Sequence, residues 1–158
     1  MSELQTVSRD ETIAVDALVD EVLVDLEPLA QEKEIKLIGN CKDTTMVGSD
    51  ILIYRMVYNL VENAIKYNHF GGQVTVTAYR KGKSICLSVE DTGSGIPAEL
   101  KERIFEPFFR VDKSRSRQLG GVGLGLALVR EIVRVHDGRI TVRSSPSGGT
   151  IFEVVFTQ

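Results

Sequence analysis

The chain lacks the features that mark several large classes of protein. Its two cysteines, Cys41 and Cys86, are too few for a disulfide framework and do not have metal-ligand spacing, which favours a reducing compartment. No apolar run approaches the roughly 20 residues that a membrane-spanning helix requires. The N-terminal residues MSELQTVSRDE contain no apolar signal region. We therefore predict a cytoplasmic protein.

An excess of basic residues is also missing, since 19 Lys and Arg stand against 22 Asp and Glu. Proteins whose main partner is nucleic acid normally carry such an excess, so we expect no nucleic-acid partner. The 158 residues are 42% hydrophobic and 26% charged, which is ordinary for a soluble globular domain. We predict one domain over residues 12–158, preceded by a polar N-terminal tail or linker remnant over residues 1–11.

Hydrophobic periodicity predicts a fold that contains both helices and strands. Alternating apolar residues predict strands over residues 12–15, 34–38, 44–47, 74–79, 85–89, 140–142 and 150–156. Apolar residues at helical spacing predict helices over residues 16–28, 50–69, 98–104 and 122–135. We expect Asp16 to cap the first helix, Pro28 to kink or end it, and strands 34–38 and 44–47 to form a hairpin. The predicted class is α+β, a two-layer α/β sandwich with a mixed, mostly antiparallel sheet and helices on one face.

The helix predicted over residues 50–69 carries polar residues beside its apolar stripe. Asn59, Asn63 and Lys66 line up as a narrow polar stripe at the border of the apolar face. This pattern is typical of a plain solvated face, but asparagine is a mediocre helix former. An amide oxygen suits a hard cation that already carries phosphate oxygens and water, and Lys66 could meet a phosphate. Tyr67, the next residue, could lie against a base.

The segment GGVGLGL, residues 120–126, is rich in glycine at the start of a predicted helix. It is not a dinucleotide fingerprint, because a charged loop precedes it instead of a strand, and it lacks the Gly-Lys-Ser/Thr of a Walker loop. Gly121, Gly123 and Gly125 would expose backbone N–H groups at a helix N-terminus, where the dipole favours phosphate. The alternative is a glycine-rich hinge.

Two further segments have an equally specific composition. IFEPFFR, residues 104–110, is either a local aromatic core or the anchor of a lid whose Arg110 reaches phosphate. DTGSGIP, residues 91–97, follows a strand, and the Asp91 carboxylate could accept a hydrogen bond from an exocyclic amine. Gly93 and Gly95 would let a flat ring lie against the backbone. Adenine has such an amine, so ATP is favoured over GTP; taken alone, the segment is a turn that opens a helix.

In this order, the segments resemble the ATP-binding catalytic domain of sensor histidine kinases, with the Bergerat-type fold of gyrase, heat-shock chaperone, histidine kinase and mismatch-repair ATPases. NLVENAIKYN (59–68) is similar to the N box, DTGSGIP to the G1 box, FEPFFR to the F box and GGVGLGL to the G2 box. The turn at residues 147–150 is similar to the last nucleotide-facing turn. Val122 stands where the family more often has threonine.

The resemblance implies Mg-ATP as the ligand and assigns a site to individual residues. Asn63, together with Asn59, would hold Mg²⁺. Lys66 and Arg110 would take phosphates, as would the backbone of Gly121, Val122, Gly123, Leu124, Gly125 and Leu126. Asp91 would bind the adenine amine, with Gly93, Gly95, Ile96, Tyr67 and Thr150 around the ring.

The resemblance also implies phosphotransfer to a histidine rather than hydrolysis. The hydrolysing members of the family have an acid at the position of Asn59, whereas a neutral imidazole near pH 7 needs no base to attack. Glu62 would steady the incoming histidine, and Lys66 and Arg110 would neutralise charge. Neither His69 nor His136 resembles the acceptor box, which is a His-Glu followed by Leu/Ile and Arg/Lys on a helical hairpin, and both stand at predicted helix ends.

We therefore expect the acceptor on a histidine-containing dimerisation domain, N-terminal to this chain in a full-length homodimer. This chain would be the cytoplasmic part of a membrane-bound sensor. A response regulator would act downstream, and this fragment would be monomeric. Two other hypotheses about the function stay open. One is an anti-sigma-type serine kinase, and the other is a nucleotide-binding or protein-docking module without turnover.

Overall fold

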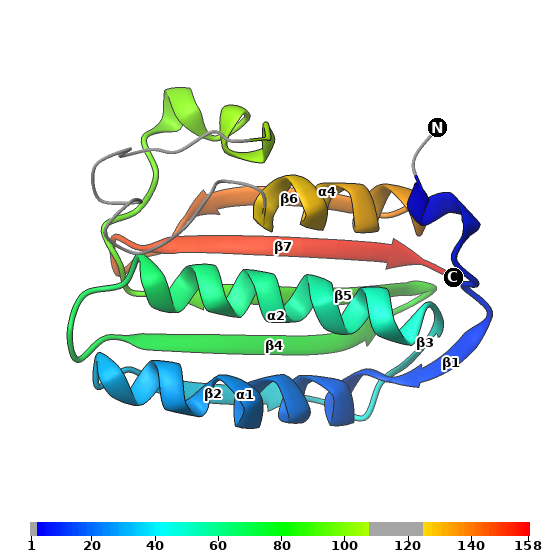
Figure 1. The fold of residues 1–158 in the computed structure, drawn as a ribbon, viewed down its shortest axis with the longest axis horizontal. Helices are drawn as coiled ribbons and strands as arrows, with labels where there is room; N and C mark the ends of the chain where they lie inside the picture. Colours follow the sequence, from blue (N-terminus) through cyan, green and yellow to red (C-terminus); the bar gives the residue numbers. More distant parts are fainter. Residues whose placement is uncertain (1–2, 108–124) are drawn as a thin grey trace.

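The computed structural model describes residues 3–107 and 125–158, which form two layers (Figure 1). The helices are α1 (Val15–Glu32), α2 (Asp50–Lys66) and α4 (Gly125–Val135), with 3₁₀ turns η1 (Glu3–Thr6), η2 (Ala98–Leu100) and η3 (Arg103–Phe105). The strands are β1 (Glu11–Ala14), β2 (Lys36–Cys41), β3 (Thr45–Gly48), β4 (Gln73–Lys81), β5 (Ser84–Asp91), β6 (Arg139–Ser144) and β7 (Thr150–Thr157).

The main sheet has the strand order β2-β4-β5-β7-β6, and a two-stranded sheet pairs β1 with β3. Within the main sheet β2 and β4 are parallel and the other neighbours are antiparallel. Helices α1, α2 and α4 lie side by side on one face of this sheet (Figure 1). The predicted two-layer α+β fold with a mixed, mostly antiparallel sheet is therefore confirmed.

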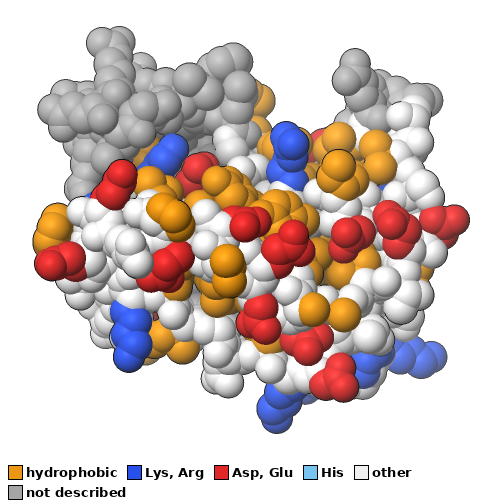
Figure 2. Space-filling view, turned by 60° about the horizontal axis from the view of Figure 1, so that its bottom comes forward, with side chains coloured by type: hydrophobic (Ala, Val, Ile, Leu, Met, Phe, Trp, Pro, Cys, Tyr) orange, Lys and Arg blue, Asp and Glu red, His pale blue; other side chains and the backbone are white. Residues whose placement is uncertain are grey.

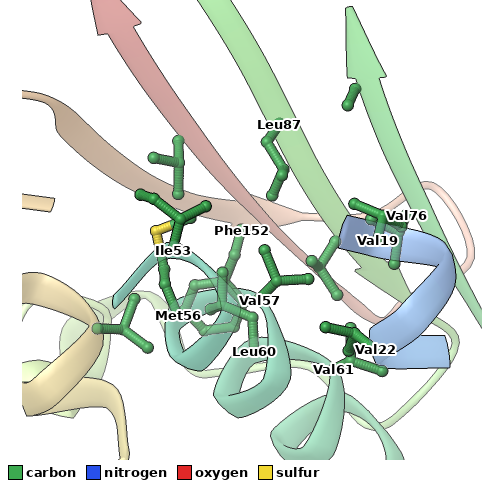
Figure 3. Close-up of a cluster of buried hydrophobic side chains, with 14 of the residues drawn as sticks. Val19, Val22, Ile53, Met56, Val57, Leu60, Val61, Val76, Leu87 and Phe152 are labelled. Atoms are coloured by element: carbon green, nitrogen blue, oxygen red, sulfur yellow. The ribbon is translucent and has the colours of Figure 1, made fainter. Parts of the chain in front are cut away.

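The core lies between the apolar stripe of α2 and the facing side of the sheet (Figure 3). Met56, Val57 and Leu60 on α2 are fully buried against inward-pointing residues of the strands, such as Leu87 and Phe152. Each such side chain contributes roughly 1.5–3 kcal/mol to folding by leaving water. This packing holds the polar border of α2 in a constant place relative to the ends of the strands.

The predicted hairpin of residues 34–38 and 44–47 is wrong. Strand β2 pairs in parallel with β4, and α2 lies on the connection between them, as a parallel pair requires. Strand β3 instead pairs with β1, where Ile13 lies opposite Met46 and both side chains are buried. The burial of these two residues at the end of the core decides the pairing, which the local pattern could not.

Helix α1 differs from the prediction at both ends. Its N-cap is Ala14, without a side-chain bond, and Asp16 lies in the first turn. Pro28 lies inside the helix, which continues to Glu32. Pro28 has no N–H for the carbonyl of Val24, but Val24 is 71% exposed, so water can solvate that carbonyl.

The outer face of α1 is strongly acidic. The helix contains six acidic residues and no Lys or Arg, and its sequence alternates these acids with the buried residues of the core side. Figure 2 shows the side of the molecule on which α1 lies, where acidic side chains stand among apolar ones. This face is solvated, which explains why the acids are tolerated there.

The N-terminal residues contact the domain, and the short helix near residue 100 departs from expectation. Leu4 and Val7 pack against the core, so the segment before β1 is attached to the domain, while the boundary at residue 12 stays a prediction. The helix expected over residues 98–104 is two separate 3₁₀ turns, η2 and η3.

Among the described residues, no helix combines the length and the apolar character that crossing a bilayer would require.

Candidate functional site

Helix α2 carries four of the predicted site residues on its half-buried border. The helix starts as predicted, because the Ser49 hydroxyl accepts a hydrogen bond from the Leu52 N–H (3.3 Å). Asn59 and Asn63 follow one turn apart, so their amides lie on the same side of the helix. Lys66 lies a turn further on, with its Nζ 3.9 Å from a carboxylate oxygen of Glu62. Amide oxygens next to an ammonium are suitable partners for a cation bound to phosphate.

Asp91 is the last residue of β5, and its carboxylate is held by two backbone groups. Oδ1 accepts hydrogen bonds from the N–H of Gly93 (2.8 Å) and from the N–H of Thr150 (3.2 Å). Asp91 is 8% exposed and Thr150 is 4% exposed. Within the described residues no hydrogen bond reaches Oδ2, which leaves one carboxylate oxygen oriented by the fold and available to a donor.

Burial raises the pKa of Asp91 above its usual value, and the hydrogen bonds from Gly93 and Thr150 oppose this shift. The nearby Glu90 carboxylate adds a smaller increase. A buried carboxylate gains more from a donor that replaces its lost hydration than an exposed one does. Asp91 is therefore suited to hold a ligand N–H, such as an exocyclic amine.

Glycines bring three segments of the chain into close contact around Asp91. A Cβ built on Gly93 would lie 2.7 Å from the Tyr67 carbonyl oxygen, directly after α2. Gly95 has a φ of +78°, and a Cβ there would lie 2.7 Å from the Gly148 carbonyl oxygen. The structure thus places Tyr67, the segment 91–95 and the turn before β7 next to one another.

A buried polar network next to this contact was not predicted. Asn68 is fully buried, donates to the Gln73 carbonyl (3.1 Å), and accepts from the Thr92 hydroxyl (3.1 Å) and the His69 N–H (2.9 Å). The Thr92 hydroxyl also accepts from the Gln73 N–H (2.9 Å). This network connects the end of α2 to the residue after Asp91. Asn68 ends the N box and Thr92 follows Asp91, so only their places in the motifs pointed to them.

The remaining predicted site residues divide into two groups. Ile96 and Leu126 pack, half-buried, against the core, and Gly125 is the first residue of α4. Phe105 of the F box is buried edge-on against Phe152, with 6.2 Å between ring centroids, which agrees with a local aromatic core there. The positions Arg110, Gly121, Val122, Gly123 and Leu124 lie outside the described residues.

His136 joins the two helices that carry predicted site residues. Its Nδ1 lies 2.8 Å from the Ile132 carbonyl of α4, and its Nε2 accepts a hydrogen bond from the Ser49 N–H at the start of α2 (3.0 Å). Nδ1 therefore carries the proton in the neutral ring. Burial lowers the pKa of His136, and Arg9 lowers it further, while the Ile132 bond and Asp137 act in the opposite direction.

The stability of the fold should depend on pH through His136. Because the folded pKa lies below the unfolded value of about 6.5, this group's contribution is present above about pH 6.5. It is lost as the pH falls from there through the folded pKa, since protonation of Nε2 removes the bond from Ser49. We expect the free energy of unfolding in urea to fall between pH 7 and 5, and to fall less in His136→Phe. Equal slopes in the wild type and in His136→Phe would contradict the assignment.

The chain is similar in sequence to a known protein family and to individual sensor histidine kinases. Residues 48–158 match the profile of the family described as histidine kinase-, DNA gyrase B- and HSP90-like ATPases. The sensor-like histidine kinase SenX3 of Mycobacterium tuberculosis (strain ATCC 25618 / H37Rv) is 40% identical over 141 residues, which are 89% of this chain and 34% of SenX3. The chain thus spans about a third of the length of this curated relative.

Solved structures with the same fold are also similar in sequence. The nucleotide-free catalytic domain of histidine kinase ThkA has a TM-score of 0.84 at 27% identity, with 95% of this chain and 96% of that chain covered. Histidine kinase ThkA in complex with the response regulator protein TrrA has a TM-score of 0.79 at 26% identity, with 94% of this chain and 41% of that chain covered.

Proposed function

The chain belongs to the family of histidine kinase-, DNA gyrase B- and HSP90-like ATPases, as an ATP-binding catalytic domain of the sensor histidine kinase type, and we propose that it transfers the γ-phosphate of Mg-ATP to a histidine. The acceptor histidine would lie on a dimerisation domain of the whole protein. The observation that best supports the nucleotide part is the Asp91 carboxylate, with Oδ1 fixed by two backbone N–H groups and Oδ2 available to the adenine amine.

Mg²⁺ and the phosphates would lie along the polar border of α2. The amide oxygens of Asn59 and Asn63 would hold Mg²⁺, which would neutralise charge on the phosphates. Lys66 would leave its 3.9 Å contact with Glu62 to meet a phosphate. By resemblance, Arg110 and the backbone of residues 121–126 would supply the remaining phosphate contacts.

The purine would bind next to Asp91, between Tyr67 and Thr150. Tyr67 and Thr150 flank Asp91 from two different segments, and Gly93 and Gly95 allow the close backbone contacts with Tyr67 and Gly148 that would frame the ring. Adenine presents an amine at the edge where guanine presents an oxygen, so Asp91 would favour ATP over GTP. Ile96 would add apolar contact from its half-buried place at the core.

The transfer step would depend mainly on position and charge. A neutral imidazole attacks through its free lone pair, so no base is needed at Asn59. The γ-phosphorus bond to the bridging oxygen breaks as the bond to the imidazole nitrogen forms, and ADP leaves. Glu62 would accept the other ring N–H of the incoming histidine and so orient it.

The partners of the whole protein follow from the same reading. We propose a cytoplasmic homodimer whose dimerisation domain carries the acceptor histidine, and a response regulator that receives the phosphoryl group. The structural relative ThkA, which is known in complex with the response regulator TrrA, supports the second partner. On this proposal the fragment alone would be monomeric, because the residues that join the two subunits would belong to the dimerisation domain.

A nucleotide titration followed by transfer in trans would test this function. We expect the chain to bind ATP more tightly with Mg²⁺ than without it, and Asn63→Ala to reduce that difference. With γ-labelled ATP and the acceptor domain of its own full-length protein, acid-labile phosphohistidine should form. Acid-stable phosphoserine would instead support a serine kinase, binding without transfer would support a docking module, and absence of ATP binding would contradict the proposal.

Replacing Glu62 should separate binding from transfer. We expect Glu62→Gln to lower the transfer rate by about 10²–10⁴-fold, which is the range for a side chain that takes up proton charge from a reacting group in the transition state. ATP affinity should not fall, because Glu62 is not assigned to the nucleotide and its neutralisation frees Lys66 to meet a phosphate. Glu27→Gln, on the exposed face of α1, is the matched control and should transfer at the wild-type rate. Wild-type transfer in Glu62→Gln would exclude this role.

A further inference from the structure

Lys33, the residue after α1, places its ammonium group at the C-terminal end of α2. Its Nζ donates hydrogen bonds to three backbone carbonyl oxygens: those of Ile65 (3.1 Å), Lys66 (2.9 Å) and Asn68 (2.7 Å). The Lys33 carbonyl in turn accepts from the Gly71 N–H (2.9 Å). Lys33 is thus bonded through both its side chain and its backbone to the end of α2 and the residues that follow it.

The physical need for this contact is clear from how α2 ends. The last carbonyls of a helix have no partner within it, and they form the negative end of the helix dipole. Many helices satisfy them with a glycine in the left-handed conformation. Here the C-cap is Tyr67 with a φ of −99°, and the Ile65 carbonyl accepts from the Asn68 N–H (3.3 Å). The ammonium of Lys33 supplies further donors to that carbonyl and to the carbonyls of Lys66 and Asn68.

The segment that Lys33 holds carries three groups of the candidate site. Lys66 projects from it toward the polar border of α2, and the Tyr67 carbonyl lies against Gly93. Asn68 fixes the Thr92 hydroxyl, directly after Asp91. A change in the carbonyl positions of residues 65–68 therefore moves both the phosphate side and the adenine side of the site.

We propose that Lys33 is a positioning residue for nucleotide binding, acting through the backbone of residues 65–68 rather than by touching the ligand. The inference rests on the proposed function of the site. It assigns a role to a residue outside the motifs, 26 positions before Asn59. A purely structural role would lower stability alone, whereas a positioning role also lowers the affinity of molecules that are fully folded.

The test measures ATP affinity at a temperature well below unfolding, for a graded set of variants. Lys33→Met keeps the length of the stem and removes all donors, Lys33→Gln keeps one amide, and Lys33→Arg keeps a cation with several N–H groups. We expect ATP affinity to fall about tenfold in Lys33→Met, less in Lys33→Gln and least in Lys33→Arg. Lys36→Met, an exposed lysine three positions away, should bind like the wild type.

Amide chemical shifts distinguish a positioning role from a purely structural one, because a general loss of stability would not change the shifts of a few residues around the site. In Lys33→Met the shifted amides should concentrate at residues 65–68 and 92–93. Folded Lys33→Met with wild-type affinity would overturn the inference, and if that variant does not fold, Lys33→Gln and Lys33→Arg with equal, wild-type affinities would do so. Failure of the wild-type chain to bind ATP would instead overturn the proposed function, so the two failures are distinguishable.

Discussion

Asp91→Asn is expected to weaken ATP binding by about 10- to 150-fold, while the fold survives. The asparagine carbonyl can take the place of Oδ1 and keep the hydrogen bonds from the N–H groups of Gly93 and Thr150. Its NH₂ group would then occupy the position of Oδ2, where a donor would face the donor of the adenine amine. Losing a hydrogen bond to a charged acceptor costs about 1.5–3 kcal/mol, which corresponds to that loss of affinity.

Inosine triphosphate makes this test specific for the amine. Inosine carries an oxygen where adenosine carries the amine, so the wild-type carboxylate should bind ITP worse than ATP, and Asp91→Asn should reduce or reverse that preference. Isothermal titration with both nucleotides measures the ratio, and thermal unfolding confirms the fold. Asp137→Asn, in the left-handed turn after α4, is the matched control. Unchanged discrimination in Asp91→Asn would show that Asp91 does not read the base.

The parts of the fold that were predictable from sequence are those set by local pattern. The β4–β5 and β6–β7 hairpins follow from alternating apolar residues around glycine-containing turns, and α2 begins at Asp50, where the helical pattern predicts it. The pairing of strand β2 was predicted wrongly because its partner β4 lies beyond α2 in the sequence. A parallel pairing depends on where the crossover helix packs, which no short window of sequence contains.

The candidate site divides in the same way. Asp91, Gly93 and Gly95 stand out because an acid at the end of a strand is followed by two glycines, and this local feature forms the hydrogen bond from the Gly93 N–H to Asp91 Oδ1. The contacts of Lys33 and Asn68 join segments distant in sequence, so their residue types carry no signal on their own. Lysine at a helix end is usually solvated, and only the approach of α1 to the end of α2 makes Lys33 different.

Gly149 is the position where a single methyl group should damage both stability and nucleotide binding. A Cβ at Gly149 would lie 2.0 Å from the Asp91 carbonyl oxygen and 2.8 Å from its Oδ1. Because the nearest of these atoms belongs to the backbone, no rotamer change can relieve the clash, and the ends of β5 and β7 must separate. We expect Gly149→Ala to lower the free energy of unfolding by about 1–3 kcal/mol, as overpacking does.

Separation of β5 from β7 would also break the hydrogen bond from Thr150 to Asp91, so ATP affinity should fall by more than about tenfold, the effect of one lost hydrogen bond of about 1.4 kcal/mol. Gly82→Ala is the control, because Gly82 has a φ of +62° and open space around it, at the other end of β5. It should lose about 1–2 kcal/mol through left-handed strain and bind ATP normally. Equal ATP affinities in the two folded variants would mean that the contact between Gly149 and Asp91 does not shape the nucleotide site.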